Sequence, residues 1–157
     1  KLLKEGITNF DNVSIDHFNF YILNRFRNFF AGGIGSVRGF DSGAIGPKAT
    51  NSSGDSFSIG GEKRVVGNAE LLFPFPGMGN DKSIRLSTFL DIGAIAGPGD
   101  EQGRYKTLSF SDMRYSVGLA VTWYSPMGPI KLSLAKPLNA AEDDKEQMFQ
   151  FQLGNVF

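Results

Sequence analysis

Residues 149–157 read Phe-Gln-Phe-Gln-Leu-Gly-Asn-Val-Phe, and this stretch carries the clearest indication of the fold. Apolar and polar residues alternate over its first five positions, as they do in an extended strand with two different faces. One face carries Phe149, Phe151 and Leu153, and the other carries the two glutamines and Gly154. The stretch ends on an aromatic residue, Phe157. An apolar outer face, small or polar inner positions and a final aromatic residue are typical of the closing strand of an outer-membrane β-barrel.

The composition limits the class of protein. The 157 residues hold 16 Lys and Arg and 16 Asp and Glu, so no basic surface for nucleic acid is expected. The chain has no Cys and a single His, which excludes disulfides, thiolate metal sites and multi-histidine metal sites, and no cofactor is predicted. Apolar runs such as residues 73–78 are far shorter than the roughly 20 residues of a transmembrane helix. No cleavable signal pattern is present at Lys1, so we expect the chain to begin inside a longer precursor.

Period-two alternation recurs through the second half of the chain. It predicts five strands, at residues 64–73, 83–95, 113–124, 129–138 and 148–157. Each has about the 9–11 residues that a tilted membrane strand needs, whereas soluble strands average about 5–6. One face of these strands is apolar, and the other carries Arg, Glu, Asp, Lys or Gln, which suits a wet barrel interior. The predicted fold is therefore all-β, the C-terminal strands of a larger antiparallel transmembrane β-barrel.

A soluble β-sandwich or lipocalin-like barrel would show the same alternation with its faces exchanged. Periodicity alone does not separate the two folds. The strand lengths and the aromatic residues at strand ends, including Phe73, Trp123 and Tyr124, favour the membrane barrel. The slightly negative mean hydropathy agrees with this, because only every second residue of a membrane strand faces lipid.

The connections between the predicted strands alternate in length. Residues 74–82 and 125–129 form short turns, and residues 96–112 and 139–147 form longer polar loops. Outer-membrane barrels have short periplasmic turns and long exterior loops. The first pair is therefore expected on the periplasmic side, together with the C-terminus, and the second pair on the exterior.

Residues 31–63 are rich in Gly, Ser and Asn and are interpreted as one long loop, with a strand and lead-in over residues 1–30. A loop of this length is usually functional or disordered. Arg38 lies in it between glycine-rich segments, and an Arg on such a loop is able to pair with a carboxylate in bidentate geometry. Glu70 and Asp91 are inner-face carboxylates on adjacent predicted strands, so we hypothesise that the loop folds into the barrel lumen and Arg38 docks on them. The alternative is a solvated Arg on an exposed loop.

Four motifs, in order, resemble those of the Omp85 superfamily. They are Val-Arg-Gly-Phe at residues 37–40, the Asp-x-Gly strand at 84–93, the Ser-Pro-x-Gly-Pro turn at 124–130, and the closing strand at 149–157. The resemblance covers residues 29–157 and is highly specific. It implies that Arg38 enters the lumen and contacts Glu70 and Asp91, with Gly39 and Phe40 supporting the loop. The family's barrels have more strands than the five predicted here, which favours a C-terminal fragment, or a sheet closed by other copies of this chain or by another chain.

The resemblance also implies a function, the folding and insertion of other outer-membrane proteins in a Gram-negative bacterium, without covalent chemistry. The implied partners are outer-membrane lipids, unfolded outer-membrane proteins and accessory assembly lipoproteins. The closing strand would pair imperfectly with the first strand of the barrel, and Gly154 would weaken this seam. The alternatives are a protein-translocating pore of the same superfamily, as in two-partner secretion, and a soluble β-barrel binding module.

No set of residues supports an enzyme. The single His17 has no partner nucleophile in the sequence, because no Gly-x-Ser-x-Gly or similar motif is present. The acidic run at residues 142–146 lacks the ligand spacing and turn glycine of a calcium loop, and is interpreted as a solvated exterior loop tip. Lys136 lies in a lipid-facing register near a strand end, where its side chain is expected to reach the membrane interface.

Overall fold

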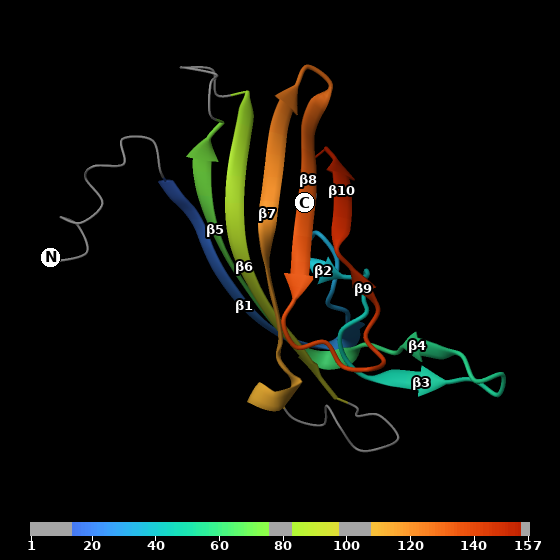
Figure 1. The fold of residues 1–157 in the computed structure, drawn as a ribbon. Helices are drawn as coiled ribbons and strands as arrows, with labels where there is room; N and C mark the ends of the chain where they lie inside the picture. The colour runs from blue at the N-terminus through green and yellow to red at the C-terminus, as the bar shows by residue number, and fades with distance from the viewer. Residues whose placement is uncertain (1–13, 76–82, 98–107, 155–157) are drawn as a thin grey trace, which may run out of the picture.

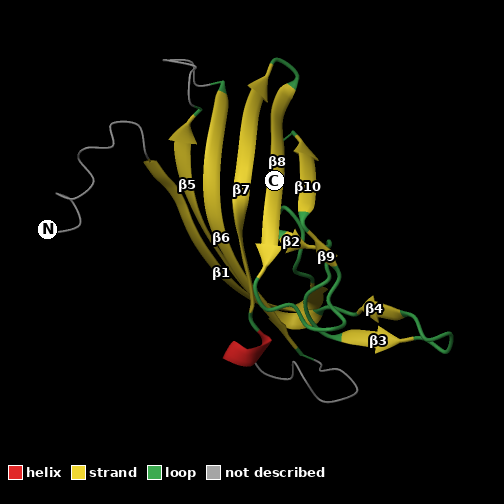
Figure 2. Cartoon of the chain, in the orientation of Figure 1, coloured by secondary structure: helices red, strands yellow, loops and turns green. Residues whose placement is uncertain are grey.

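The computed structural model describes residues 14–75, 83–97 and 108–154, with the backbone alone over residues 14–27. Its main feature is a curled antiparallel sheet of six strands, in the order β1-β5-β6-β7-β8-β10 (Figures 1 and 2). The strands are β1 (Ser14–Phe29), β5 (Gly61–Pro74), β6 (Ile84–Ala96), β7 (Arg114–Ser125), β8 (Gly128–Pro137) and β10 (Phe149–Leu153). Consecutive long strands pair throughout, so the sheet is a meander interrupted by the long loop after β1.

The predicted all-β antiparallel fold is confirmed by this sheet. Strands β5 to β8 match the ranges predicted from alternation to within three residues at each end. β1 lies in the segment with the weakest alternation. Its pairing with β5 is irregular at two places, between Ile15 and His17 and between Asn24 and Phe29.

The closing strand is shorter than predicted. The prediction covered residues 148–157, whereas β10 ends at Leu153. Gly154 has a φ of 78°, which leaves the extended conformation and ends the strand. Its N–H still donates to the carbonyl of Pro129, at 2.8 Å. The last part of the predicted strand, residues 155–157 with the terminal Phe157, lies outside the described residues.

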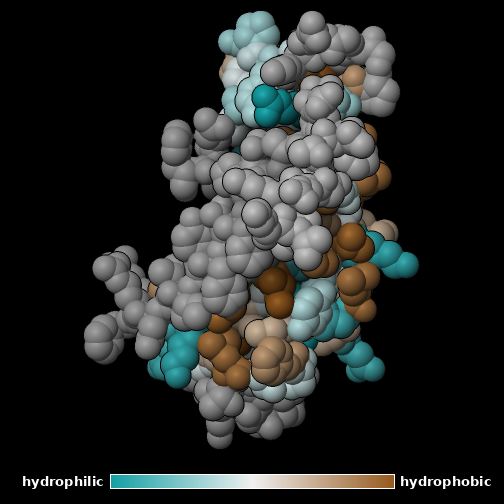
Figure 3. Space-filling model, turned by 90° about the vertical axis from the view of Figure 1, so that its left-hand side faces the viewer, coloured by the Kyte–Doolittle hydropathy of each residue, from teal (hydrophilic) through white to brown (hydrophobic). Residues whose placement is uncertain are grey.

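The outer face of the sheet is apolar and exposed. The register aligns Phe73, Leu86, Val121, Leu132 and Phe151 across five neighbouring strands. The exposed apolar side chains of this face are Leu71, Leu90, Val117, Leu119, Trp123, Leu132, Leu134, Phe149, Phe151 and Leu153. Figure 3 shows hydrophobic residues, in brown, running down the right-hand side of the described surface.

The inner face carries mainly small or polar side chains, and several of them are buried. Ser87, Ala120, Ser133 and Gln150 align across β6, β7, β8 and β10, and each is at most 4% exposed. Apolar side chains outside and polar side chains inside are the reverse of a soluble barrel. This arrangement suits a sheet with lipid on its outer face.

The loop between β1 and β5 contains short strands that the sequence did not predict. They are β2 (Gly39–Phe40), β3 (Lys48–Thr50) and β4 (Ser56–Ser58). β3 and β4 form a hairpin that projects from the lower end of the sheet (Figure 1). Strands of two or three residues are too short to show a period-two pattern.

An apolar cluster joins this loop to the sheet. Ala31, Val37, Phe40, Ala44 and Ile45 of the loop are buried together with Ile95 near the end of β6. Two further short elements follow, the 3₁₀ helix η1 (Phe110–Asp112) and β9 (Glu146–Gln147). β9 pairs with β2, so the loop contacts the sheet on one side and the segment before β10 on the other.

Candidate functional site: a loop docked on the inner face of the sheet

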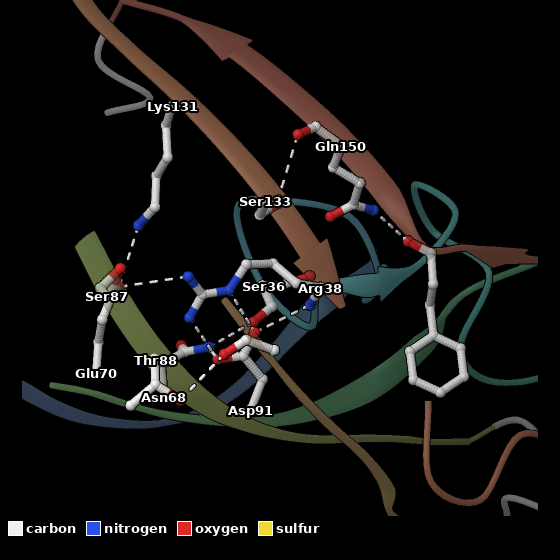
Figure 4. A network of polar contacts seen from close by, with 12 residues as sticks. Ser36, Arg38, Asn68, Glu70, Ser87, Thr88, Asp91, Lys131, Ser133 and Gln150 are labelled. Carbon is white, nitrogen blue, oxygen red and sulfur yellow. Dashed lines mark hydrogen bonds and ion pairs between the residues drawn. The ribbon is translucent and has the colours of Figure 1, made fainter. Parts of the chain in front are cut away.

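A buried arginine fastens the loop to the inner face of the sheet (Figure 4). Arg38 is 3% exposed, and Asp91 on β6 is fully buried. Arg38 Nε lies 2.7 Å from Asp91 Oδ2, and Arg38 Nη2 lies 2.8 Å from Asp91 Oδ1, which is bidentate pairing of a guanidinium with a carboxylate. The backbone N–H of Arg38 also donates to Asp91 Oδ2, at 3.0 Å. Asp91 therefore holds both the main chain and the side chain of this loop residue.

A second carboxylate, Glu70 on β5, extends the cluster. Arg38 Nη1 lies 3.3 Å from Glu70 Oε2, and Lys131 Nζ on β8 lies 3.0 Å from the same oxygen. Ser87 Oγ donates to Glu70 Oε1 at 2.6 Å. Two cations thus face two carboxylates, and this pairing offsets the cost of removing the charges from water.

The amide of Asn68 braces the same point. Asn68 Nδ2 donates to Asp91 Oδ1 at 2.9 Å and to the carbonyl of Ser36 at 2.6 Å. One side chain of β5 therefore orients the carboxylate and holds the loop two residues before Arg38.

An aromatic ring supports the guanidinium from the sheet side. Arg38 Cζ lies 3.4 Å from the centroid of Phe89, a stacked cation–π contact. Phe89 is 2% exposed and pairs across the sheet with Gly118 of β7. A Cβ on Gly118 would lie 2.5 Å from the tip of the ring and would also meet the carbonyl oxygen of Leu134. The glycine therefore leaves space for the ring on which Arg38 rests.

Each residue of the Val-Arg-Gly-Phe motif has a distinct place. Val37 is buried against Gly93, where a side chain on the glycine would overlap with it. Gly39 has a φ of 91°, which favours glycine, and lies close to Ala135 and Pro137 of β8. Phe40 is fully buried in the apolar cluster of the loop.

The structure brings the predicted residues Arg38, Glu70 and Asp91 together in one ionic cluster. The predicted Gly39 lies beside β8, and the predicted Phe40 lies in the apolar cluster of the loop. The predicted closing-strand residues lie elsewhere. Phe149, Phe151 and Leu153 are exposed on the outer face, and Gly154 follows them.

Sequence reasoning missed four members of the site, Lys131, Phe89, Ser87 and Asn68. Lys131, Ser87 and Asn68 share the inner-face register with the predicted carboxylates, and that register was the available signal. Phe89 breaks the polar inner pattern, and nothing in its spacing indicates a partner.

A second buried ionic cluster lies at the loop end of the sheet. Asp144 accepts a hydrogen bond from Arg114 Nε and lies 2.9 Å from Lys48 Nζ. Its side chain is fully buried, so the prediction of a solvated tip for residues 142–146 is wrong at this position. The sequence pattern did not show that a loop lysine and a strand arginine converge on the acidic run.

The pKa of Asp144 is lower than that of an ordinary aspartate. Burial alone would raise it, but the backbone N–H of Ala141 and the cations Arg114 and Lys48 stabilise the charged form and outweigh burial. Asp144 therefore stays ionised and joins β7, the long loop and the segment between β8 and β9.

The described residues hold no cluster of His, Cys, Asp and Glu suited to a metal ion. Within the same residues, no helix is long and apolar enough to cross a membrane. The side chain of His17 is outside the description. What the site provides is a set of charge-assisted hydrogen bonds that fix a loop on a sheet.

An exposed apolar outer face and a polar inner face carrying a docked loop define an outer-membrane β-barrel protein. The family model of the Omp85 superfamily domain matches residues 13–157. The chain belongs to the Omp85 superfamily. The predicted membrane barrel and its outer-membrane location are thereby confirmed, and family membership places the chain outside the enzymes.

Within the superfamily, the chain is similar to outer membrane protein assembly factors named BamA. The chain is 43% identical to outer membrane protein assembly factor BamA of Neisseria meningitidis serogroup B, over 84% of this chain and 19% of that protein. It is 32% identical to BamA of Nitratidesulfovibrio vulgaris, over 84% of this chain and 16% of that protein. The crystal structure of Haemophilus ducreyi BamA lacking POTRA domains 1-3 matches with a TM-score of 0.65 and 34% identity, over 79% of this chain and 26% of that one. The chain spans less than a fifth of the length of these curated relatives.

Proposed function

We propose that this chain is part of a BamA-like assembly factor that folds and inserts β-barrel proteins into the outer membrane. The similarity to two proteins of that name carries the proposal. No nucleotide or covalent step is required. The incoming strand is folded by pairing with an exposed edge of the sheet.

The docked loop, residues 31–63, serves as an internal brace in this proposal. In a closed barrel it lies in the lumen and reaches the wall through Arg38, Glu70 and Asp91, while Gly39 and Phe40 fit it to the sheet. The bidentate pair and the buried setting support this role, because breaking a buried ion pair costs about 3–5 kcal/mol. A loop held so firmly keeps the wall in shape while another part of the barrel moves.

The moving part is the closing strand. β10 pairs with β8 over five residues, and in the described chain its other edge has no strand partner. Gly154 turns the chain out of the extended conformation directly after it. A short strand with an available edge suits templating by β-augmentation, in which backbone groups of an incoming strand pair with that edge. The outer side chains Phe149, Phe151 and Leu153 then face lipid.

The partners follow from this mechanism. Unfolded outer-membrane proteins are the substrates, and outer-membrane lipids cover the exposed apolar face. Accessory assembly lipoproteins act with the complete protein. The turn at residues 125–128 lies on the periplasmic side, and the projecting β3–β4 hairpin lies on the exterior side.

A reconstituted folding assay tests the proposal. The natural full-length protein that carries this sequence is placed in liposomes, and a urea-denatured barrel substrate is added. Folding is followed by the heat-dependent mobility of the substrate on a mild detergent gel. We expect faster folding than in empty liposomes, and a reduced rate with Arg38→Ala. Folding no faster than in empty liposomes, together with passage of a partner protein through the barrel, would favour a translocating pore instead.

A further inference from the structure

The docked loop also contacts the closing strand. We propose that Gln150 couples the loop to β10 and thereby sets how readily that strand opens, a positioning role that rests on the function proposed above. Gln150 Nε2 donates to the carbonyl oxygen of Phe40 at 2.7 Å, joining the residue after Gly39 to the inner face of β10 (Figure 4).

The contact belongs to a continuous set of hydrogen bonds between the loop and the segment that leads into β10. β2 pairs with β9 through Gly39 with Gln147 and through Phe40 with Glu146. The N–H of Asp41 donates to the carbonyl of Lys145 at 2.8 Å. β9 is separated from β10 by one residue, so a loop anchored at Arg38 holds the entry to the closing strand.

Gln150 is the residue through which this set of hydrogen bonds extends to β10 itself. Among the described residues, no other β10 side chain hydrogen-bonds to the loop. Gln150 is 4% exposed, and its other amide contact, with Gln147 Oε1, is longer at 3.4 Å. A hollow of about 430 Å³ lies beside it, lined by residues 32–36 of the loop, Arg64 of β5, and Gln147 and Phe151. The hydrogen bond to Phe40 is therefore the short polar contact that this buried side chain makes with the loop.

The carbonyl of Phe40 accepts a second hydrogen bond, from the N–H of Gly33 at 3.0 Å. Loss of the Gln150 donor therefore leaves that oxygen satisfied within the loop. The loop keeps its Arg38 anchor, and β10 loses its inner tether. Loss of the Gln150 donor should therefore change the stability of β10 without changing that of the loop.

Hydrogen exchange on the natural full-length protein tests the coupling. Gln150→Glu keeps the shape and removes the donor, and Gln150→Leu is a second, uncharged variant. The matched control is Gln152→Glu, on the same face two residues along, whose amide donates to the Gly154 carbonyl and not to the loop. A folding check by heat-dependent mobility accompanies each variant.

We expect amide exchange over residues 149–153 to become about tenfold faster in both Gln150 variants, the effect of one buried hydrogen bond. Exchange over residues 36–41 should stay unchanged, and Gln152→Glu should change neither segment. In an Arg38→Ala background, Gln150→Glu should add nothing, because the loop no longer holds the strand. Unchanged exchange over 149–153, or full additivity with Arg38→Ala, would overturn the coupling.

The hydrogen-exchange experiment tests the coupling separately from the folding assay, which tests the proposed function. Faster strand exchange with an unaltered rate of substrate folding would keep the coupling and count against the proposed function. Faster exchange with an altered folding rate supports both.

Discussion

Val37 rests directly on Gly93, so that a side chain on the glycine would occupy the same space as the valine methyl group. Asp91, two residues earlier on the same face of β6, holds Arg38. The Asp-x-Gly spacing therefore has a physical meaning. Asp91 binds the guanidinium of Arg38. Gly93 leaves room for Val37, the residue before Arg38.

The first prediction concerns that space. Gly93→Ala should displace Val37 and loosen the loop, because the added methyl group has no free volume. Limited trypsin digestion of the membrane-embedded protein should then cut faster in residues 36–48. Val37→Ala in the same chain should restore protection, since it reopens the space. Equal loosening with and without Val37→Ala would show that the overlap is not the cause.

The second prediction separates charge from geometry at Arg38. Arg38→Lys keeps the cation but loses the bidentate pairing with Asp91 and the stacking on Phe89. We expect the free energy of loop opening to fall by about 1–3 kcal/mol with Lys and by about 3–5 kcal/mol with Ala. Hydrogen exchange over residues 36–41 measures both. Lys behaving as the native arginine would mean that charge alone anchors the loop.

A third prediction concerns the ring beneath the guanidinium. Phe89→Leu keeps an apolar side chain but removes the cation–π contact, so the loop should be less stable by about 0.5–2 kcal/mol. The same exchange experiment measures this effect. In an Arg38→Ala background, the substitution should have a much smaller effect on loop exchange. A loss of the same size in both backgrounds would mean that Phe89 acts only through the packing of the sheet.

The fourth prediction is a pH dependence. Because the pKa of Asp144 is depressed in the folded protein, its contribution to stability is present above the ordinary aspartate pKa. It is lost as the pH falls through the folded value. Exchange of residues 48–50 and 141–144, corrected for the intrinsic exchange rate at each pH, should therefore accelerate on acidification in the native protein.

Asp144→Asn is the matched variant for that experiment. It should exchange faster than the native protein at neutral pH, and its rate, corrected for intrinsic exchange, should depend much less on pH. If the native protein and the Asp144→Asn variant share the same pH profile, the titration of Asp144 is not the cause.

The sequence predicted the sheet well because long strands with two unlike faces produce a clear period-two pattern. The alternation located β5 to β8, and the inner register placed Glu70 and Asp91 on adjacent strands. Arg38 was indicated by its glycine-rich surroundings and by the family motif. The alternation also placed Gly154 within the closing strand, whereas its positive φ ends β10 at Leu153, a backbone conformation that the pattern does not contain.

Long-range contacts within the loops were beyond such patterns. Lys48, Arg114 and Asp144 come from three separate segments, and only the folded chain brings them together. The pairing of β2 with β9 and the Gln150–Phe40 hydrogen bond are of the same kind. Alternation describes one strand at a time, and it carries no information about which loop lies over which face.

If the loop is docked on the inner wall in the membrane, two cysteines placed on either side of the contact should form a disulfide. The sequence has no Cys, and Val37 Cβ lies 3.8 Å from an ideal Cβ position on Gly93, a typical separation for a disulfide. We expect Val37→Cys with Gly93→Cys to cross-link spontaneously in oxidising conditions, with each single variant as control. A double variant that folds into the membrane and stays fully reduced would mean that the loop is not docked on the wall there.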